Sequence, residues 1–140
     1  MKIKVNKLKG RLLDYAVALA IGYAPGEPLL GSDGKVVLGY HENFYWYGTK
    51  VEGNALLVAH HLDFTPSTCW AQGGPLLDSV QMDLTTCYLG ARLKYLATIP
   101  GFVMPGITGE TLLIAGLKCL VSLKLGNEVD IPEQLIGETI

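Results

Sequence analysis

The chain has 140 residues, of which 49% are hydrophobic and only 17% charged, so it can bury the core of one domain, expected over residues 1–140. This composition excludes intrinsic disorder. The net charge of −2 argues against binding to duplex nucleic acid, because proteins that bind it usually carry an excess of basic residues. The few charges predict a homo-oligomer that shares an apolar face, although an apolar monomer has the same composition.

The N-terminal segment predicts a short strand followed by a helix. Lys2–Val5 alternates charged and apolar residues, which is typical of a strand with one buried face and requires a partner further along the chain. Apolar residues then recur at helical spacing from Arg11 to Tyr23, and Gly22 indicates the helix end. Asp14 lies early in this helix, where the helix dipole favours an anion.

The next third of the chain predicts a small antiparallel sheet. Residues 25–34 are rich in proline and glycine and predict a long turn-rich connection. Four consecutive aromatic residues follow at 44–47. Successive side chains of a strand point to opposite faces, so these four cannot all enter one core. At least one pair would lie in a second layer, a ligand surface or an oligomer interface, and Trp46 is a candidate ligand contact.

The segment Thr65–Pro75 combines hydroxyls, an amide, a tryptophan and a Gly-Gly pair between two prolines. Such a segment cannot be regular throughout, and a demanding loop in an apolar chain is a typical place for a functional site. Stacking on the indole and hydrogen bonds to backbone and side chains would suit a nucleotide or a sugar. The equally weighted alternative is a rigid loop with the tryptophan in the core. The candidate ligand-binding residues are Ser67, Thr68, Trp70, Gln72, Gly73 and Gly74.

Other candidate sites are weaker. Arg11 and Arg92 are the only arginines, and arginine is the best bidentate partner for phosphate, although a solvated surface arginine is the more common case. His60, His61 and Asp63 form the only cluster of metal-type ligands. Adjacent histidines of a strand point to opposite faces, so we expect no metal and no cofactor.

The C-terminal half contains one clear helix. Residues 76–96 fit a helix in part and a strand equally well. Thr111 is a predicted N-cap for a helix from Leu112 to Leu125 that Gly126 ends. The predicted core stripe of this helix is Leu113, Leu117, Leu120 and Val121, with Lys118 and Lys124 on the other side and in the last turn, where the helix dipole favours cations.

Cysteine use and the N-terminus predict where the protein acts. Cys69, Cys87 and Cys119 are odd in number and widely spaced, which fits free thiols in a reducing cytoplasm. The basic start lacks an apolar run with a cleavage site, so no signal peptide is expected. No stretch of about eighteen apolar residues occurs, so no membrane span is expected either.

Three segments together resemble the NinX family of small proteins from lambdoid phages. They are Lys2–Val5 with Gly10–Ala18, then Pro66–Leu76, then Thr111–Ala115 with Leu125–Pro132, and residues 25–63 lie outside the resemblance. The family pattern has Asp where this chain has Cys69, and Pro where it has Leu112. The first departure argues against a catalytic carboxylate or a cysteine nucleophile at position 69. The resemblance implies a phage accessory protein in the cytoplasm of the infected bacterial host, with no assigned reaction.

We therefore expect a single α+β domain with two main helices, about 11–23 and 111–125, packed on a small, mostly antiparallel sheet. The predicted function is non-enzymatic binding of a small nucleotide-like ligand, as in anti-defence proteins that sequester a host immune signal. One alternative is a metal-dependent hydrolase or nuclease that uses Asp63, Asp78 or His61. The other is an interaction module that inhibits a host factor through the aromatic strand.

Overall fold

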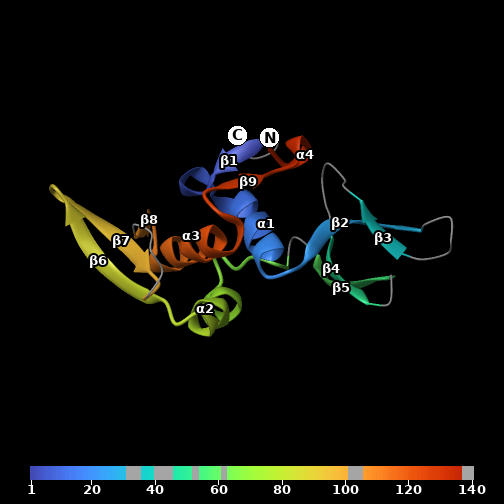
Figure 1. The fold of residues 1–140 in the computed structure, drawn as a ribbon, viewed down its shortest axis with the longest axis horizontal. Coiled ribbons are helices and arrows are strands. Elements are labelled where there is room, and N and C mark those ends of the chain that lie inside the picture. The colour runs from blue at the N-terminus through green and yellow to red at the C-terminus, as the bar shows by residue number, and fades with distance from the viewer. Residues whose placement is uncertain (31–35, 40–45, 52–53, 61–62, 101–105, 137–140) are drawn as a thin grey trace.

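The computed structural model describes residues 1–30, 36–39, 46–51, 54–60, 63–100 and 106–136, and for residues 24–60 it describes only the backbone. The chain has the predicted α+β fold. Helices occupy the centre, one group of strands extends on one side of them, and a second group extends on the other (Figure 1). Among the described residues, no helix has the length and hydropathy needed to cross a membrane.

Three helices build the core. They are α1 (Gly10–Ala20), α2 (Trp70–Ser79) and α3 (Leu112–Leu125), and a short α4 (Glu133–Ile136) follows. The predicted stripe of α3 is confirmed, because all of its members are buried, namely Leu113, Leu117, Leu120 and Val121. The predicted N-cap is also confirmed, since the Thr111 hydroxyl accepts a hydrogen bond of 3.0 Å from the Ile114 N–H.

The end of α1 is fixed by Gly22. This residue has a φ of 92°, in the left-handed region that favours glycine. The N–H of Tyr23 donates to the Ala18 carbonyl at 2.8 Å, and that of Gly22 to the Leu19 carbonyl at 3.1 Å, which is the Schellman pattern. The predicted helix is thus correct, although its regular part ends at Ala20.

A two-stranded antiparallel sheet joins the beginning of the chain to a segment after α3. Strand β1 (Lys2–Lys4) pairs with β9 (Glu128–Asp130), which confirms the strand predicted at the N-terminus. Lys2 lies opposite Asp130 and Lys4 opposite Glu128, so charges of opposite sign face each other across the pair. A single 3₁₀ turn, η1 (Val5–Lys7), then leads towards α1.

The second sheet confirms the antiparallel sheet predicted for this third of the chain. It has the order β3-β2-β4-β5, with bounds β2 (Ala24–Leu30), β3 (Val36–Gly39), β4 (Trp46–Val51) and β5 (Asn54–His60). The turn-rich connection expected at 25–34 is wrong for residues 25–30, which belong to β2. Strand β4 pairs with residues 24–26 and β3 with residues 27–30, so each half of β2 has one partner in these ladders and tolerates proline, which lacks an N–H.

The third sheet resolves the ambiguity over residues 76–96. Strands β6 (Asp83–Leu89) and β7 (Arg92–Thr98) form an antiparallel hairpin, and β8 (Ile107–Gly109) pairs with β7. Ala97 in β7 is buried against Ala115 and Cys119 of α3. The described residues therefore form three small antiparallel sheets around the helices, where one sheet had been expected.

Candidate functional site

The segment Thr65–Pro75 is not a loop throughout. Helix α2 begins at Trp70 and contains Gly73, Gly74 and Pro75, so the prediction of an irregular Gly-Gly loop is wrong. Local propensity opposes a helix here, because glycine costs about 1 kcal/mol and an interior proline about 3 kcal/mol relative to alanine. The helix forms nevertheless, and its packing against α3 supplies the reason.

Glycines bring α2 and α3 into close contact. A Cβ added at Gly73 would lie 2.6 Å from the Pro66 carbonyl oxygen and 2.7 Å from Cδ1 of Leu113. A Cβ added at Gly116 of α3 would lie 2.6 Å from Cδ1 of Leu77, one turn after Gly73. Each helix therefore places a leucine on a glycine of the other. Gly73 has a packing role in this structure.

The side-chain amide of Gln72 holds the chain that precedes α2. Its Oε1 accepts a hydrogen bond of 2.9 Å from the Thr65 N–H, and its Nε2 donates one of 2.8 Å to the Asp63 carbonyl. Both ends of the amide thus bind backbone groups of the same short segment. These bonds compete with the ligand contacts predicted for this side chain.

A buried contact joins α1 to the same segment. Asp14 is 6% exposed, and its Oδ1 accepts a hydrogen bond of 2.8 Å from the N–H of Ser67, which is 4% exposed. The pKa of Asp14 is raised from 3.8 to about 6. Burial is the main cause of this rise, and the Ser67 N–H and hydroxyl partly offset it. Asp14 was expected to interact with the helix dipole, but it serves as a tertiary acceptor. The Ser67 hydroxyl makes no hydrogen bond of good geometry.

The other predicted ligand contacts are spread over several elements. Thr68 and Trp70 are exposed, Trp70 by 54%, which excludes the alternative that this tryptophan lies in the core. Arg11 is half-buried on α1, and Arg92 is exposed at the start of β7. Trp46 lies in β4, on the opposite side of the helices from β7 (Figure 1).

The described residues line a pocket at a different place. A partly open cavity of about 580 Å³ lies between the first residues of the chain, β8, α3 and β9. Its lining comprises Lys4, Val5, Asn6, Gly106, Ile107, Thr108, Ser122, Asn127 and Glu128. None of the predicted ligand-binding residues belongs to this lining. Its volume lies within the range of about 300–1,000 Å³ that is typical of small-molecule sites.

Lys118 lies directly behind the pocket wall. It is 8% exposed, and its Nζ donates a hydrogen bond of 2.9 Å to the carbonyl of Asn6, a lining residue. Burial lowers the pKa of Lys118 from its ordinary value, and the negative charge of Glu110 opposes this effect. Lys118 was expected on the side of α3 away from the apolar stripe, and η1 covers it there, so this lysine is largely buried.

The comparison with protein families decides what kind of protein this is. The model of a family described as Bacteriophage P22, NinX matches residues 4–124. The chain belongs to this NinX family. A search of curated proteins finds no match.

The segments that carry the NinX resemblance meet in the core. Asp14 of the first segment binds the Ser67 N–H of the second, and Gly73 of the second packs against Leu113 of the third. The central segment, which was expected to be a ligand site, thus joins α1 to α3. This packing accounts for the glycine, the glutamine and the buried serine, and leaves Thr68 and Trp70 at the surface.

The two positions at which this chain was expected to depart from the NinX pattern lie at helix N-termini. Cys69 is the N-cap of α2 and has extended backbone angles, but its side chain accepts no capping hydrogen bond. An aspartate at an N-cap accepts a hydrogen bond from the free N–H groups of the first turn. Leu112 is the first residue of α3, where proline is favoured. The aspartate of the pattern therefore fits a capping role, which needs no catalysis.

Cys69→Asp is expected to stabilise the protein by about 1 kcal/mol, because the carboxylate would cap α2 and favour its positive dipole end. Urea unfolding near neutral pH measures this change. Cys69→Ala is the control, since it also removes the thiol but supplies no acceptor. Equal stabilities of the two variants would contradict a capping role at this position.

The metal-dependent alternative gains no support from the described residues. Asp63 and Asp78 are both exposed, and His61 lies outside the described residues. Within the described ranges, no group of three or more His, Cys, Asp or Glu side chains is arranged to hold a metal ion. The side chain of Trp46, on which the interaction-module alternative depends, also lies outside the described part.

Proposed function

We propose that this NinX protein binds a small nucleotide-like ligand, and that the pocket lined by η1, β8, α3 and β9 is its binding site. The pocket itself is the observation that carries the proposal, because its volume suits a ligand of this size. The proposal moves the site away from residues 65–75, whose polar groups largely hold the fold together.

The lining groups suit a ligand with a ring and many polar atoms. Val5 and Ile107 supply apolar surface, while Thr108 and Ser122 supply hydroxyls that both donate and accept hydrogen bonds. The amides of Asn6 and Asn127 do the same. Such a mixture of donors, acceptors and apolar groups is typical of sites that recognise the edges of a nucleobase and the hydroxyls of a sugar.

Membership in a phage family supports a role in the infected bacterium. We expect the protein to act in the host cytoplasm and to sequester a nucleotide immune signal, which is the anti-defence function predicted above. Such a role requires tight binding without turnover, so no catalytic group is needed. A homo-oligomer is also part of the proposal, and the exposed cross-strand pair Tyr88 and Leu93 would offer it an apolar contact.

A panel of nucleosides, nucleotides, cyclic dinucleotides and ADP-ribose-type signals tests the proposal by melting temperature. At ligand concentrations of about 100 times Kd, the correct ligand is expected to raise the melting temperature by about 5–10 °C. Thr108→Tyr should abolish the shift, because the larger side chain occupies the pocket. Thr85→Tyr is the matched control, since Thr85 and Thr108 lie opposite the same residue, Leu96, but only Thr108 lines the pocket.

Two results would contradict the proposal. One is that no member of the panel shifts the melting temperature of the unmodified protein. The other is that both tyrosine variants bind the active ligand as tightly as the unmodified protein does. Recovery of the unchanged ligand after heat denaturation distinguishes sequestration from hydrolysis.

A further inference from the structure

Lys118 is a largely buried residue whose partly buried ammonium group has no carboxylate partner within ion-pair distance among the described residues. It is 8% exposed, and among the described residues its only hydrogen bond goes to a neutral group, the carbonyl of Asn6. Glu110 acts on it electrostatically, but neither this nor any other described carboxylate lies within 4.0 Å of its Nζ. Glu110 is itself exposed, so solvent screens its charge.

Such an arrangement is costly in a protein of this size. Burying a charge requires a partner of opposite sign or several hydrogen bonds, and a missing partner leaves much of the desolvation cost without compensation. An ammonium has three donors, and Asn6 takes one of them. The other two have no acceptor among the residues that the structure describes. Lys118 therefore retains capacity to bind an anion.

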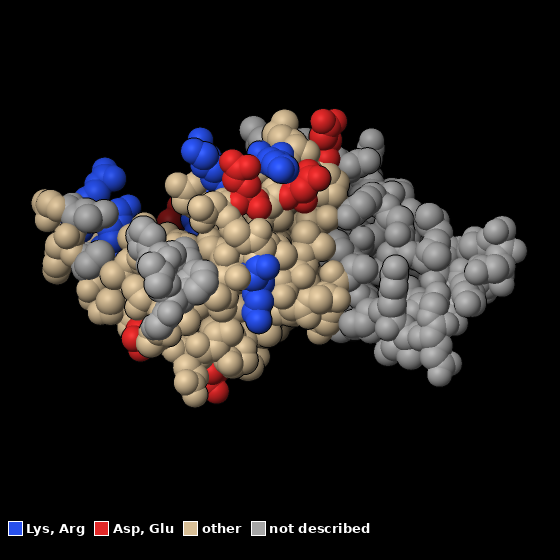
Figure 2. Space-filling view, viewed as in Figure 1, with Lys and Arg blue, Asp and Glu red and all other residues tan. Residues whose placement is uncertain are grey.

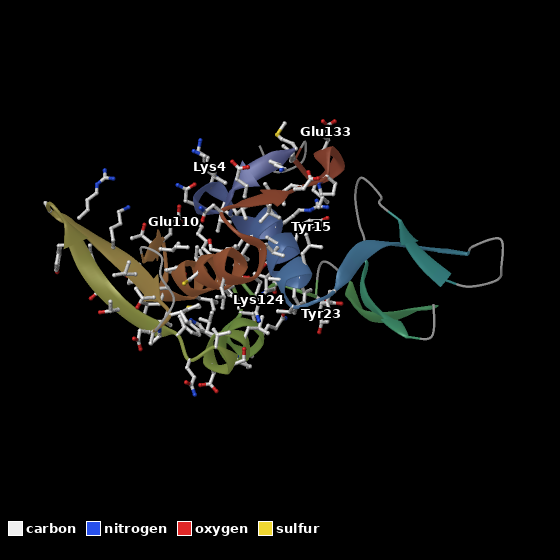
Figure 3. The ribbon with its side chains drawn as sticks, viewed as in Figure 1. Lys4, Tyr15, Tyr23, Glu110, Lys124 and Glu133 are labelled. Carbon is white, nitrogen blue, oxygen red and sulfur yellow. The ribbon has the colours of Figure 1, made fainter. Side chains whose placement is uncertain are left out.

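The pocket lies next to Lys118, although Lys118 is not one of its lining residues. Asn6, the partner of Lys118, lines the pocket, and so does Ser122, one helical turn after Lys118 on the same face of α3. In Figure 3, Lys4 and Glu110 lie on the same side of the molecule, around the ends of β1 and α3.

The charged side chains of the lining sum to zero, so the positive charge of Lys118 is an excess over them. Lys4 and Glu128 lie opposite each other in the β1–β9 pair and cancel in the sum over the lining. Figure 2 shows this mixture of signs over the β1–β9 end of the molecule. Lys118, directly behind the wall, thus adds one positive charge, which the exposed Glu110 opposes only from beyond ion-pair distance.

We infer that the pocket binds the phosphate group of its ligand, that the Ser122 hydroxyl donates to a phosphate oxygen, and that Lys118, which does not itself line the pocket, attracts the phosphate with its positive charge from behind Asn6. This inference rests on the proposed function and narrows it from a nucleoside-sized ligand to a phosphorylated one. Phosphate suits the site because its charge is opposite to that of Lys118 and its oxygens accept hydrogen bonds from a hydroxyl such as that of Ser122.

Inorganic phosphate tests the inference without knowledge of the whole ligand. At constant ionic strength, replacing chloride with phosphate should raise the melting temperature of the unmodified protein by about 3 °C. Lys118→Met removes the charge but keeps the length of the chain, and its melting temperature should no longer respond specifically to phosphate. Lys124→Met is the matched control on the same helix, because Lys124 is exposed and does not line the pocket (Figure 3). Equal phosphate shifts in the two variants would overturn the inference.

A second measurement needs no variant and stands if Lys118→Met fails to fold. In protein with ¹⁵N-labelled lysine, the Nζ resonance of Lys118 should shift on addition of phosphate and saturate, while that of Lys124 should not. An unchanged Lys118 resonance would overturn the inference.

Matched nucleoside and nucleotide pairs separate this inference from the proposed function. We expect a nucleotide to bind at least about tenfold more tightly than its nucleoside, and the ratio to fall to about one in Lys118→Met. Equal affinity of both members in the unmodified protein would overturn the phosphate site but leave the ligand pocket. Absence of binding by both members, with a phosphate response intact, would instead overturn the proposed function.

Discussion

Gly73→Ala is expected to lower the free energy of unfolding by about 3 kcal/mol, the largest effect that we predict for any single methyl group in this chain. The added Cβ would lie 2.6 Å from the Pro66 carbonyl oxygen and 2.7 Å from Leu113, so α2 must move away from α3. A backbone oxygen cannot turn aside as the end of a flexible side chain can. Urea unfolding followed by circular dichroism measures the loss.

Gly74→Ala is the matched control for this prediction. The two glycines are adjacent in α2, but a Cβ at Gly74 would meet only Cε3 of Trp70, at an ordinary contact distance of 3.5 Å. Alanine favours a helix over glycine by about 1 kcal/mol, so Gly74→Ala should stabilise the protein. Equal destabilisation by both changes would contradict the packing of α2 against α3. It would also restore the alternative that the Gly-Gly pair forms a loop.

Asp14→Asn is expected to increase stability near neutral pH by up to about 3 kcal/mol. Burial raises the pKa of Asp14 to about 6 from 3.8, so the folded protein holds a proton that the unfolded chain releases between these values. The stabilisation from this carboxyl is therefore fully present below about pH 3.8 and is lost as the pH rises through about 6. Asparagine stays neutral and keeps an acceptor for the Ser67 N–H.

The difference in unfolding free energy between Asp14→Asn and the unmodified protein, measured from about pH 4 to pH 7.5, tests this prediction. The difference should be small at the acid end and should grow in favour of the variant through about pH 6. Asp78→Asn, at an exposed position of α2, is the control and should give no such trend. A difference that is independent of pH would show that Asp14 is solvated, and would contradict the buried link between α1 and the segment before α2.

The sequence predicted those elements correctly whose signals lie within their own segment, such as α3 and β1. Thr111, the periodic leucines and Gly126 specify α3 within one segment, so its bounds and buried stripe agree with the structure. The alternation in Lys2–Val5 predicted β1, although its partner β9 lies more than a hundred residues away. The sequence favoured a loop at residues 65–75, because the stabilisation of α2 comes from Leu113 and Gly116 of another helix.

The candidate site was much harder to predict than the fold. The pocket is lined by residues 4–6, 106–108, 122 and 127–128, which are separated along the chain and carry no motif. Lys118 has the spacing of a solvated residue, and only the tertiary position of η1 buries it. The segment Thr65–Pro75 was predicted to be a ligand site because it combines glycine, proline and tryptophan. In the structure most of its unusual residues serve the contact between helices.

The most direct test of the central claim is to locate the ligand by the amide resonances of ¹⁵N-labelled protein during titration with the nucleotide that gives the largest melting shift. If the pocket is the site, saturable shifts should concentrate at Asn6, Thr108, Ser122 and Asn127. The amides of Thr68, Trp70 and Gly74 should remain unchanged. Shifts centred on those three residues, with the pocket amides unaffected, would contradict the account and return the site to Thr65–Pro75.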